Sequence, residues 1–92
     1  MVKTANATRP TVFRLYAPGA KKVSLVGTFN NWNTKKLSAK KDTKGNWTVK
    51  TNLKPGKYEY KFLVDGNWVN DPSCGTYITN SFGSQNCVVE VR

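Results

Sequence analysis

The chain has 92 residues, with 15 lysines and arginines against 5 aspartates and glutamates, and a formal net charge of +10. A chain of this length forms one small domain with a thin core, which excludes a large enclosed active site. The lysines are scattered, mostly near expected turns and strand ends, so their charge favours a solvated surface over a nucleic-acid interface, and no stretch is apolar enough to span a membrane.

The first eleven residues are polar and show no periodicity. We expect residues 1–11 to be a flexible lead-in and residues 12–92 to form one domain. The lead-in lacks the hydrophobic region of a signal peptide, which favours a cytoplasmic location. A bond between Cys74 and Cys87 would instead favour export, so the sequence leaves the location open.

Two short strands are predicted at the start of the domain. Phe13, Leu15 and Ala17 alternate with more exposed residue types, and Pro18 with the glycine after it ends this strand in a turn. A second alternating segment covers residues 23–27. We expect these two strands to pair as a hairpin.

An asparagine-rich loop follows over residues 27–33, because asparagine tolerates the left-handed conformations that tight loops need. We expect Phe29 to anchor this loop inward and Trp32 to lie at its tip. A short strand is predicted over residues 37–40. After a turn, Trp47 begins another alternating strand.

The clearest strand pattern covers residues 57–65, where four apolar side chains alternate with more polar ones. Asp65 and Gly66 then supply the residues that a two-residue hairpin turn prefers. The hairpin places Trp68 beside the polar face that carries Lys61. The core is the alternative location for Trp68.

A long loop is expected from Ser73 to Gln85, and a last strand begins at Cys87. A loop of that length is uncommon in a compact domain unless it is functional. About seven short strands separated by turns predict an all-β fold, an antiparallel β-sandwich of immunoglobulin-like size. An open barrel that binds single-stranded nucleic acid is the alternative.

The residue types argue against catalysis, metal binding and a cofactor. There is no histidine to act as a base or to complete a zinc site, and most of the five acids sit where turns need them. Hydrolysis of a glycoside ordinarily needs two carboxyl groups that flank one bond. We therefore interpret the chain as a non-enzyme.

Planar and amide side chains remain as binding candidates. A pyranose ring has an apolar face that aromatic rings cover and a rim of hydroxyls that amides or an ammonium group bind. A nucleic-acid site would interleave aromatics with arginine, and the chain has only three arginines. Composition leaves a sugar site and a generic binding surface open; the sugar candidates are Trp32, Lys61, Trp68, Phe82 and the asparagines of the loops.

Several motifs in this order resemble one known family. Val-Gly-Thr-Phe-Asn-Asn-Trp, Tyr-Glu-Tyr-Lys-Phe-Leu-Val-Asp-Gly-Asn-Trp and Asn-Ser-Phe-Gly-Ser-Gln-Asn are similar to motifs of carbohydrate-binding module family forty-eight. That family includes the glycogen-binding domain of the AMP-activated protein kinase beta subunit and the early-set domains of branching and debranching enzymes. The resemblance implies an early-set β-sandwich that binds α-1,4-linked glucans such as glycogen, starch or maltooligosaccharides.

The resemblance also implies roles for individual residues. Trp32 and Trp68 correspond to the two stacking platforms of the family, and Lys61 and Asn86 to the residues that bind glucose hydroxyls. The glycogen-binding domain of the kinase beta subunit has a leucine and a threonine in its long loop, and the resemblance places Phe82 and Ser84 at these two positions.

Two other functions stay open. One alternative is a docking β-sandwich for a glucan-metabolising enzyme or a kinase, with an idle sugar site. The presence of both Trp32 and Trp68 with Lys61 argues against an idle site. The other alternative is a basic nucleic-acid binder, whose affinity would fall steeply with salt. The paired state of Cys74 and Cys87, the oligomeric state and any larger parent protein are also left open.

Overall fold

The computed structural model describes residues 8–92. Strands dominate this part of the chain, and its single helical element is a short 3-10 turn, η1 (Thr28–Asn30). The strands are β1 (Arg9–Tyr16), β2 (Val23–Gly27), β3 (Lys40–Lys41), β4 (Asn46–Leu53), β5 (Gly56–Val64), β6 (Asn67–Val69), β7 (Tyr77–Thr79) and β8 (Gln85–Val91). No helix among the described residues is long and apolar enough to cross a membrane.

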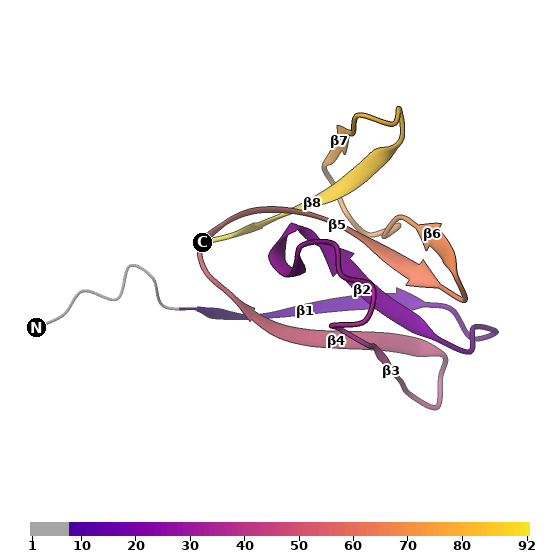
Figure 1. Cartoon of the computed structure of the whole chain (residues 1–92). Helices are drawn as coiled ribbons and strands as arrows, with labels where there is room; N and C mark the ends of the chain where they lie inside the picture. The colour runs from indigo at the N-terminus through magenta and orange to yellow at the C-terminus, as the bar shows by residue number, and fades with distance from the viewer. Residues whose placement is uncertain (1–7) are drawn as a thin grey trace, which may run out of the picture.

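The strands form two antiparallel sheets (Figure 1). One sheet has the order β1-β4-β3, and the other has the order β2-β5-β8-β7. In the larger sheet, β8 pairs with the first part of β5 and β6 pairs with residues 62–64 at its end. Side chains from both sheets meet in one apolar core. This arrangement confirms the predicted all-β antiparallel sandwich.

The first strand begins earlier than the sequence indicated. β1 starts at Arg9, which pairs with Leu53 of β4, so residues 9–11 belong to the sheet and not to a lead-in. Thr8 precedes the strand, and residues 1–7 of the predicted lead-in lie outside the described residues.

The predicted hairpin between the first two strands is wrong. β1 pairs with β4, whereas β2 pairs with β5 in the other sheet. The link between them is held by the Asp65 carboxylate, whose Oδ1 accepts hydrogen bonds from the backbone N–H groups of Lys21 (2.9 Å) and Lys22 (2.8 Å). Asp65 belongs to the β5–β6 turn, so this contact draws the chain across to the second sheet.

The core fills the space between the two sheets. Phe13 of β1 meets the ring of Tyr60 of β5 edge-on, with 4.9 Å between the ring centroids. Trp47 of β4 is buried, and its indole Nε1–H donates to the Ala17 carbonyl at 2.8 Å. Phe62 of β5 is fully buried, as its place in the alternating pattern predicted.

The short strand predicted over residues 37–40 is displaced. Its first part bonds to β2, where Leu25 N–H donates to the Leu37 carbonyl and Ala39 N–H to the Val23 carbonyl, each at 2.8 Å. The residues that follow this part form β3, which pairs with the side of β4 opposite β1. This segment therefore passes from the edge of one sheet to the edge of the other.

The β5–β6 hairpin confirms the predicted turn. Asp65 and Gly66 both have positive φ values, 48° and 85°, and Leu63 pairs with Trp68 across the hairpin. The long loop was only partly predicted, because β7 forms within it and pairs with β8.

Candidate functional site

A groove of about 610 Å³ opens on the outer face of the larger sheet. It contains all six residues that the family resemblance placed in the site, together with four further residues, but of the loop asparagines only Asn80 and Asn86 line it. The lining residues are Thr28, Trp32, Glu59, Lys61, Trp68, Asn80, Ser81, Phe82, Ser84 and Asn86. The structure therefore brings the six candidates to one place, while their contact with a sugar stays a prediction.

The floor of the groove comes from neighbouring strands. Glu59 and Lys61 of β5 alternate with the inward-facing Tyr60, so both point away from the core. Asn86 of β8 is only 5% exposed, and its Nδ2 donates to Glu59 Oε1 at 3.0 Å. Its Oδ1 accepts from Asn80 Nδ2 at 3.3 Å, so hydrogen bonds on both sides hold the Asn86 amide in one orientation.

Trp32 reaches the groove through a tight loop after β2. Asn30 closes this loop, because its Oδ1 accepts from Gly27 N–H at 3.1 Å and its Nδ2 donates to the Leu25 carbonyl at 3.2 Å. A side chain at Gly27 would collide with the Glu59 carbonyl oxygen, so only glycine fits there. Trp32 itself has a positive φ of 57° and donates its N–H to the Gly27 carbonyl at 2.9 Å.

Phe29 anchors this same loop, as predicted. Its ring packs against the core with a centroid separation of 5.8 Å from Phe13 and 5.9 Å from Tyr58. The inward Phe29 and the half-buried Trp32 therefore take opposite directions from one loop.

Trp68 stands on the outer face of the β5–β6 hairpin. It lies opposite Leu63, on the sheet face that also carries Lys61, and 51% of its surface is exposed. The alternative that Trp68 belongs to the core is excluded by this exposure.

The loop between β7 and β8 supplies the third wall. Asn80 Oδ1 accepts from Phe82 N–H at 2.9 Å and from Ser84 N–H at 3.2 Å, and Gly83 adopts the positive φ that the turn requires. Phe82 is 93% exposed at the tip of this loop. Ser84 Oγ accepts from Lys61 Nζ at 3.3 Å, which ties the loop to the floor.

The sequence matches a family model described as the glycogen recognition site of AMP-activated protein kinase, over residues 9–92. The chain belongs to this family. Membership confirms the resemblance to carbohydrate-binding module family forty-eight, and it makes the chain a non-catalytic carbohydrate-binding module of the glycogen-recognition type.

Relatives in this glycogen-recognition family are similar over nearly the whole chain. The 5'-AMP-activated protein kinase subunit beta-1 of Sus scrofa is 39% identical over 90 residues, which cover 98% of this chain and 70% of the relative. The beta-2 subunit of Mus musculus is 40% identical and the beta-1 subunit of Homo sapiens 38% identical. The chain spans 32% of the length of each of these last two relatives.

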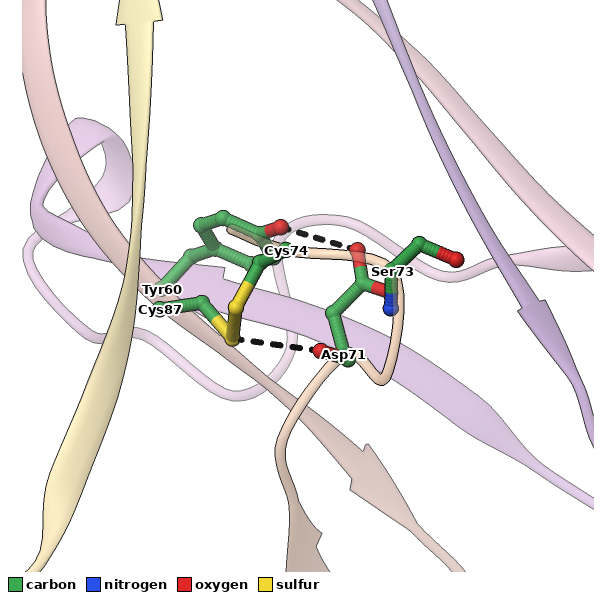
Figure 2. The surroundings of a disulfide bond; sticks show 5 residues. All are labelled: Tyr60, Asp71, Ser73, Cys74 and Cys87. Atoms are coloured by element: carbon green, nitrogen blue, oxygen red, sulfur yellow. Dashed lines mark hydrogen bonds between the residues drawn. A yellow bond between two sulfur atoms is a disulfide. The ribbon is translucent and has the colours of Figure 1, made fainter. Parts of the chain in front are cut away.

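A disulfide lies directly beneath the groove of this glycogen-recognition module. Cys74 and Cys87 are joined, with 6.0 Å between their Cα atoms (Figure 2). Cys87 is fully buried and follows Asn86 of the groove floor. The bond therefore ties the loop after β6 to the strand that carries a groove residue.

Next to the disulfide lies Asp71, one of the acids that the sequence assigned to turns, and its carboxylate is buried. It does begin a turn, because its Oδ1 accepts from Ser73 N–H at 2.8 Å. Its Oδ2 also accepts from the Tyr60 hydroxyl at 2.8 Å (Figure 2). Burial, together with this hydrogen bond, raises the pKa of Tyr60 well above its ordinary value.

Three groove residues were absent from the sequence candidates, Thr28, Glu59 and Ser81, whereas Asn80 was included only as one of the loop asparagines. The position of Glu59, two residues before Lys61 in an alternating strand, was a usable signal for its presence on the same face. Thr28 gave no such signal, because its Oγ1 serves as the acceptor for Glu59 N–H only after two distant strands have paired. Among residues 8–92 no cluster of histidine, cysteine or acidic side chains forms a metal site.

Proposed function

We propose that the chain binds α-1,4-linked glucans, such as glycogen, starch and maltooligosaccharides, in the groove on the outer face of the larger sheet. The observation that carries this proposal is the convergence of Trp32, from the loop after β2, and Trp68, from strand β6, on one groove. Membership in the glycogen-recognition family supports the α-glucan class.

Trp32 and Trp68 are the stacking platforms in this proposal. The C–H face of a glucose ring is apolar and packs against an indole ring, which buries area on both without requiring a charge. Phe82 adds a third aromatic ring, which is largely exposed, at the rim of the same groove. Exposed rings of this size gathered in one place are typical of an interaction site.

The polar residues of the groove bind the sugar hydroxyls. Lys61 has three ammonium protons and shares one of them with Ser84, so it retains donors for a ligand. The Asn86 amide keeps a second N–H and a second lone pair beyond its bonds to Glu59 and Asn80. The fixed orientation of that amide reduces the entropy that is lost on binding.

A titration with maltoheptaose, and with cellohexaose as the control, tests the proposal. We expect affinity for maltoheptaose in the range of about micromolar to millimolar, because an open groove has little area with which to offset the ordering of a flexible sugar. We expect no comparable binding of cellohexaose. Equal affinity for the two sugars, or none for either, would refute the α-glucan assignment.

The same titration at two salt concentrations tests the nucleic-acid alternative. Stacking on a neutral sugar involves no counterion release, so the affinity for maltoheptaose should hardly change between about 50 and 200 mM salt. Tight binding of single-stranded nucleic acid with a steep salt dependence would favour the alternative.

We further propose that glucan binding brings an enzyme partner, a kinase or a glucan-metabolising enzyme, to its carbohydrate. The support is that the similar proteins are named as subunits of a protein kinase. The test is co-sedimentation of enzyme activity with glycogen from an extract. Enzyme activity should co-sediment with glycogen when the wild-type chain is present and should stay in the supernatant with Trp68→Ala. Equal activity in the glycogen pellet for both chains would contradict the proposal.

A further inference from the structure

The outer strands of the two sheets differ in how their open edges are protected. An unpaired strand edge is a template for another strand, and proteins block it with lysine, proline or a covering segment. β1 carries Arg9 and Pro10, and β3 consists of Lys40 and Lys41. The edge of β2 is covered by residues 37–39, which bond to it.

Strand β7, at the free end of the order β2-β5-β8-β7, has none of these devices. Its three residues, Tyr77, Ile78 and Thr79, are all exposed, and Tyr77 and Ile78 expose 44% and 46% of their surface. No residue from Pro72 to Val89 carries a charge, in a chain with a net charge of +10. Figure 1 shows β7 at the outer end of the larger sheet, away from the smaller one.

The backbone pairing of β7 with β8 decides which of its groups face outward. Val88 N–H donates to the Thr76 carbonyl at 2.9 Å, and Asn80 N–H donates to the Ser84 carbonyl at 2.8 Å. Because hydrogen-bonded pairs alternate along an antiparallel ladder, Ile78 also directs its backbone groups toward β8. The N–H and C=O groups of Tyr77 and Thr79 therefore point away from the sheet.

We propose that β7 pairs antiparallel with β7 of a second copy of this chain, around a two-fold axis at Ile78. In this register Tyr77 lies opposite Thr79 of the second copy, and both residues have outward backbone groups. Each of the two pairs exchanges two hydrogen bonds, so the edge is complementary to itself. The two Ile78 side chains meet at the close spacing of a non-hydrogen-bonded pair.

The charge distribution favours a second copy as the occupant. Two chains with a net charge of +10 repel each other over most of their surface, but the uncharged hairpin of β7 and β8 brings no like charges together. The contact is small, since a stable interface buries about 800 Å² per partner and a three-residue strand supplies less. The dimer is therefore weak, with a Kd in about the millimolar range for the free protein.

Pairing of this kind places both grooves on one side of a continuous sheet. Ile78 pairs with Asn86, so the two residues share the sheet face on which the groove opens. A two-fold axis between antiparallel edge strands runs perpendicular to the sheet and keeps equivalent faces on the same side. A long glucan can then occupy both grooves, which raises its apparent affinity through effective concentration. This last step rests on the proposed function, whereas the dimer does not.

Sedimentation equilibrium of the sugar-free protein up to about 1 mM tests the dimer. We expect the apparent mass to rise above 10.3 kDa with concentration for the wild type. Thr79→Pro should remain monomeric, because it removes an outward N–H that β8 does not use. Ile78→Lys places two charges at the axis and should also remain monomeric, with Val12→Lys on the exposed face of β1 as the matched control.

An apparent mass of 10.3 kDa for the wild type at every concentration would overturn the proposal. This holds even if a different protein, once added, pairs with the edge of β7. Association of both edge variants to the same extent as the wild type would also overturn it. In a parallel titration, Thr79→Pro should bind maltoheptaose as the wild type does but lose about 10-fold or more of the affinity for glycogen. Failure of the wild type to bind maltoheptaose would contradict the proposed function and leave the sedimentation result to decide the dimer.

Discussion

Trp47 lies on β4 of the smaller sheet and Trp68 on β6 of the larger sheet, and the two side chains differ in whether they face the core. Trp47 faces the core, is 6% exposed, and donates its indole N–H to the Ala17 carbonyl. Trp68 faces outward beside Lys61 and is 51% exposed. The comparison teaches that the sheet face, and not the residue type, decides whether an indole stabilises the fold or is available to a ligand.

The two faces are also held together by different interactions. The inner face is packed with apolar side chains such as Phe62 and Leu25, both fully buried. The groove is fixed by a network of hydrogen bonds in which Asn80 bonds to Ser84 and Asn86, and Asn86 bonds to Glu59. Substitutions on the inner face should therefore lower stability, and those in the groove should lower affinity.

The largest expected effect is that of Trp47→Ala on stability. Removal of this buried ring should lower the free energy of unfolding by about 3–5 kcal/mol, because it leaves a cavity between the sheets. Denaturant unfolding measures the change. A folded fraction of the variant should bind maltoheptaose as the wild type does, and an unchanged free energy of unfolding would contradict the comparison.

The next largest effect concerns the disulfide between Cys74 and Cys87. Reduction should lower the free energy of unfolding by about 3 kcal/mol in the chain-entropy model. Denaturant unfolding with and without reductant measures it, and the double variant Cys74→Ala/Cys87→Ala is the control that should not respond to reductant. Two reactive thiols in the unfolded, unreduced protein would refute the bond.

Substitutions of the groove tryptophans should affect binding alone. Trp68→Ala and Trp32→Ala should each weaken maltoheptaose binding by about 1–3 kcal/mol, a magnitude taken from the stacking of nucleic-acid bases on aromatic side chains. Both substitutions should hardly change the melting temperature. Tyr16→Ala is the matched control, since Tyr16 is 66% exposed on the other sheet and lies outside the groove. A Trp68→Ala variant with a much lower melting temperature and an unchanged affinity for maltoheptaose would contradict the assignment of Trp68 to the groove.

The smallest expected effect is on the pH dependence of stability at alkaline pH. The pKa of Tyr60 is raised in the folded state, so its contribution to stability is complete below the ordinary tyrosine pKa of about 10 and is lost as the pH rises above that value. Above that pH the unfolded chain releases the proton while the folded chain keeps it. The wild type should therefore lose up to about 1.4 kcal/mol per pH unit more than Tyr60→Phe.

Unfolding at a series of pH values from about 9 to 11.5 measures this difference, and the other tyrosines contribute equally to both proteins. Parallel curves for the wild type and Tyr60→Phe would show that Tyr60 is not held in its neutral form by burial and Asp71.

The sequence by itself determined which way side chains point along each strand and where the central hairpin turns. Alternation in β5 predicted that Tyr60 and Phe62 face inward and Lys61 outward, because successive residues of a strand take opposite sides whatever the strand pairs with. Asp65 and Gly66 predicted their turn for an equally local reason, the ease with which they adopt positive φ. Residue types also indicated Trp32, Lys61, Trp68, Phe82 and the loop asparagines as candidates, and the family motifs selected Asn86 among these asparagines and added Ser84.

Only the tertiary structure decided which strands are neighbours and which distant residues meet. Asp65 bonds to the link between β1 and β2, which lie in two different sheets, and the buried Asp71 carboxylate accepts a hydrogen bond from Tyr60. The strand β7 formed in a predicted loop because β8 supplies its backbone partners. Contacts of this kind join residues far apart in the chain, so no periodicity or turn preference within a short segment can specify them.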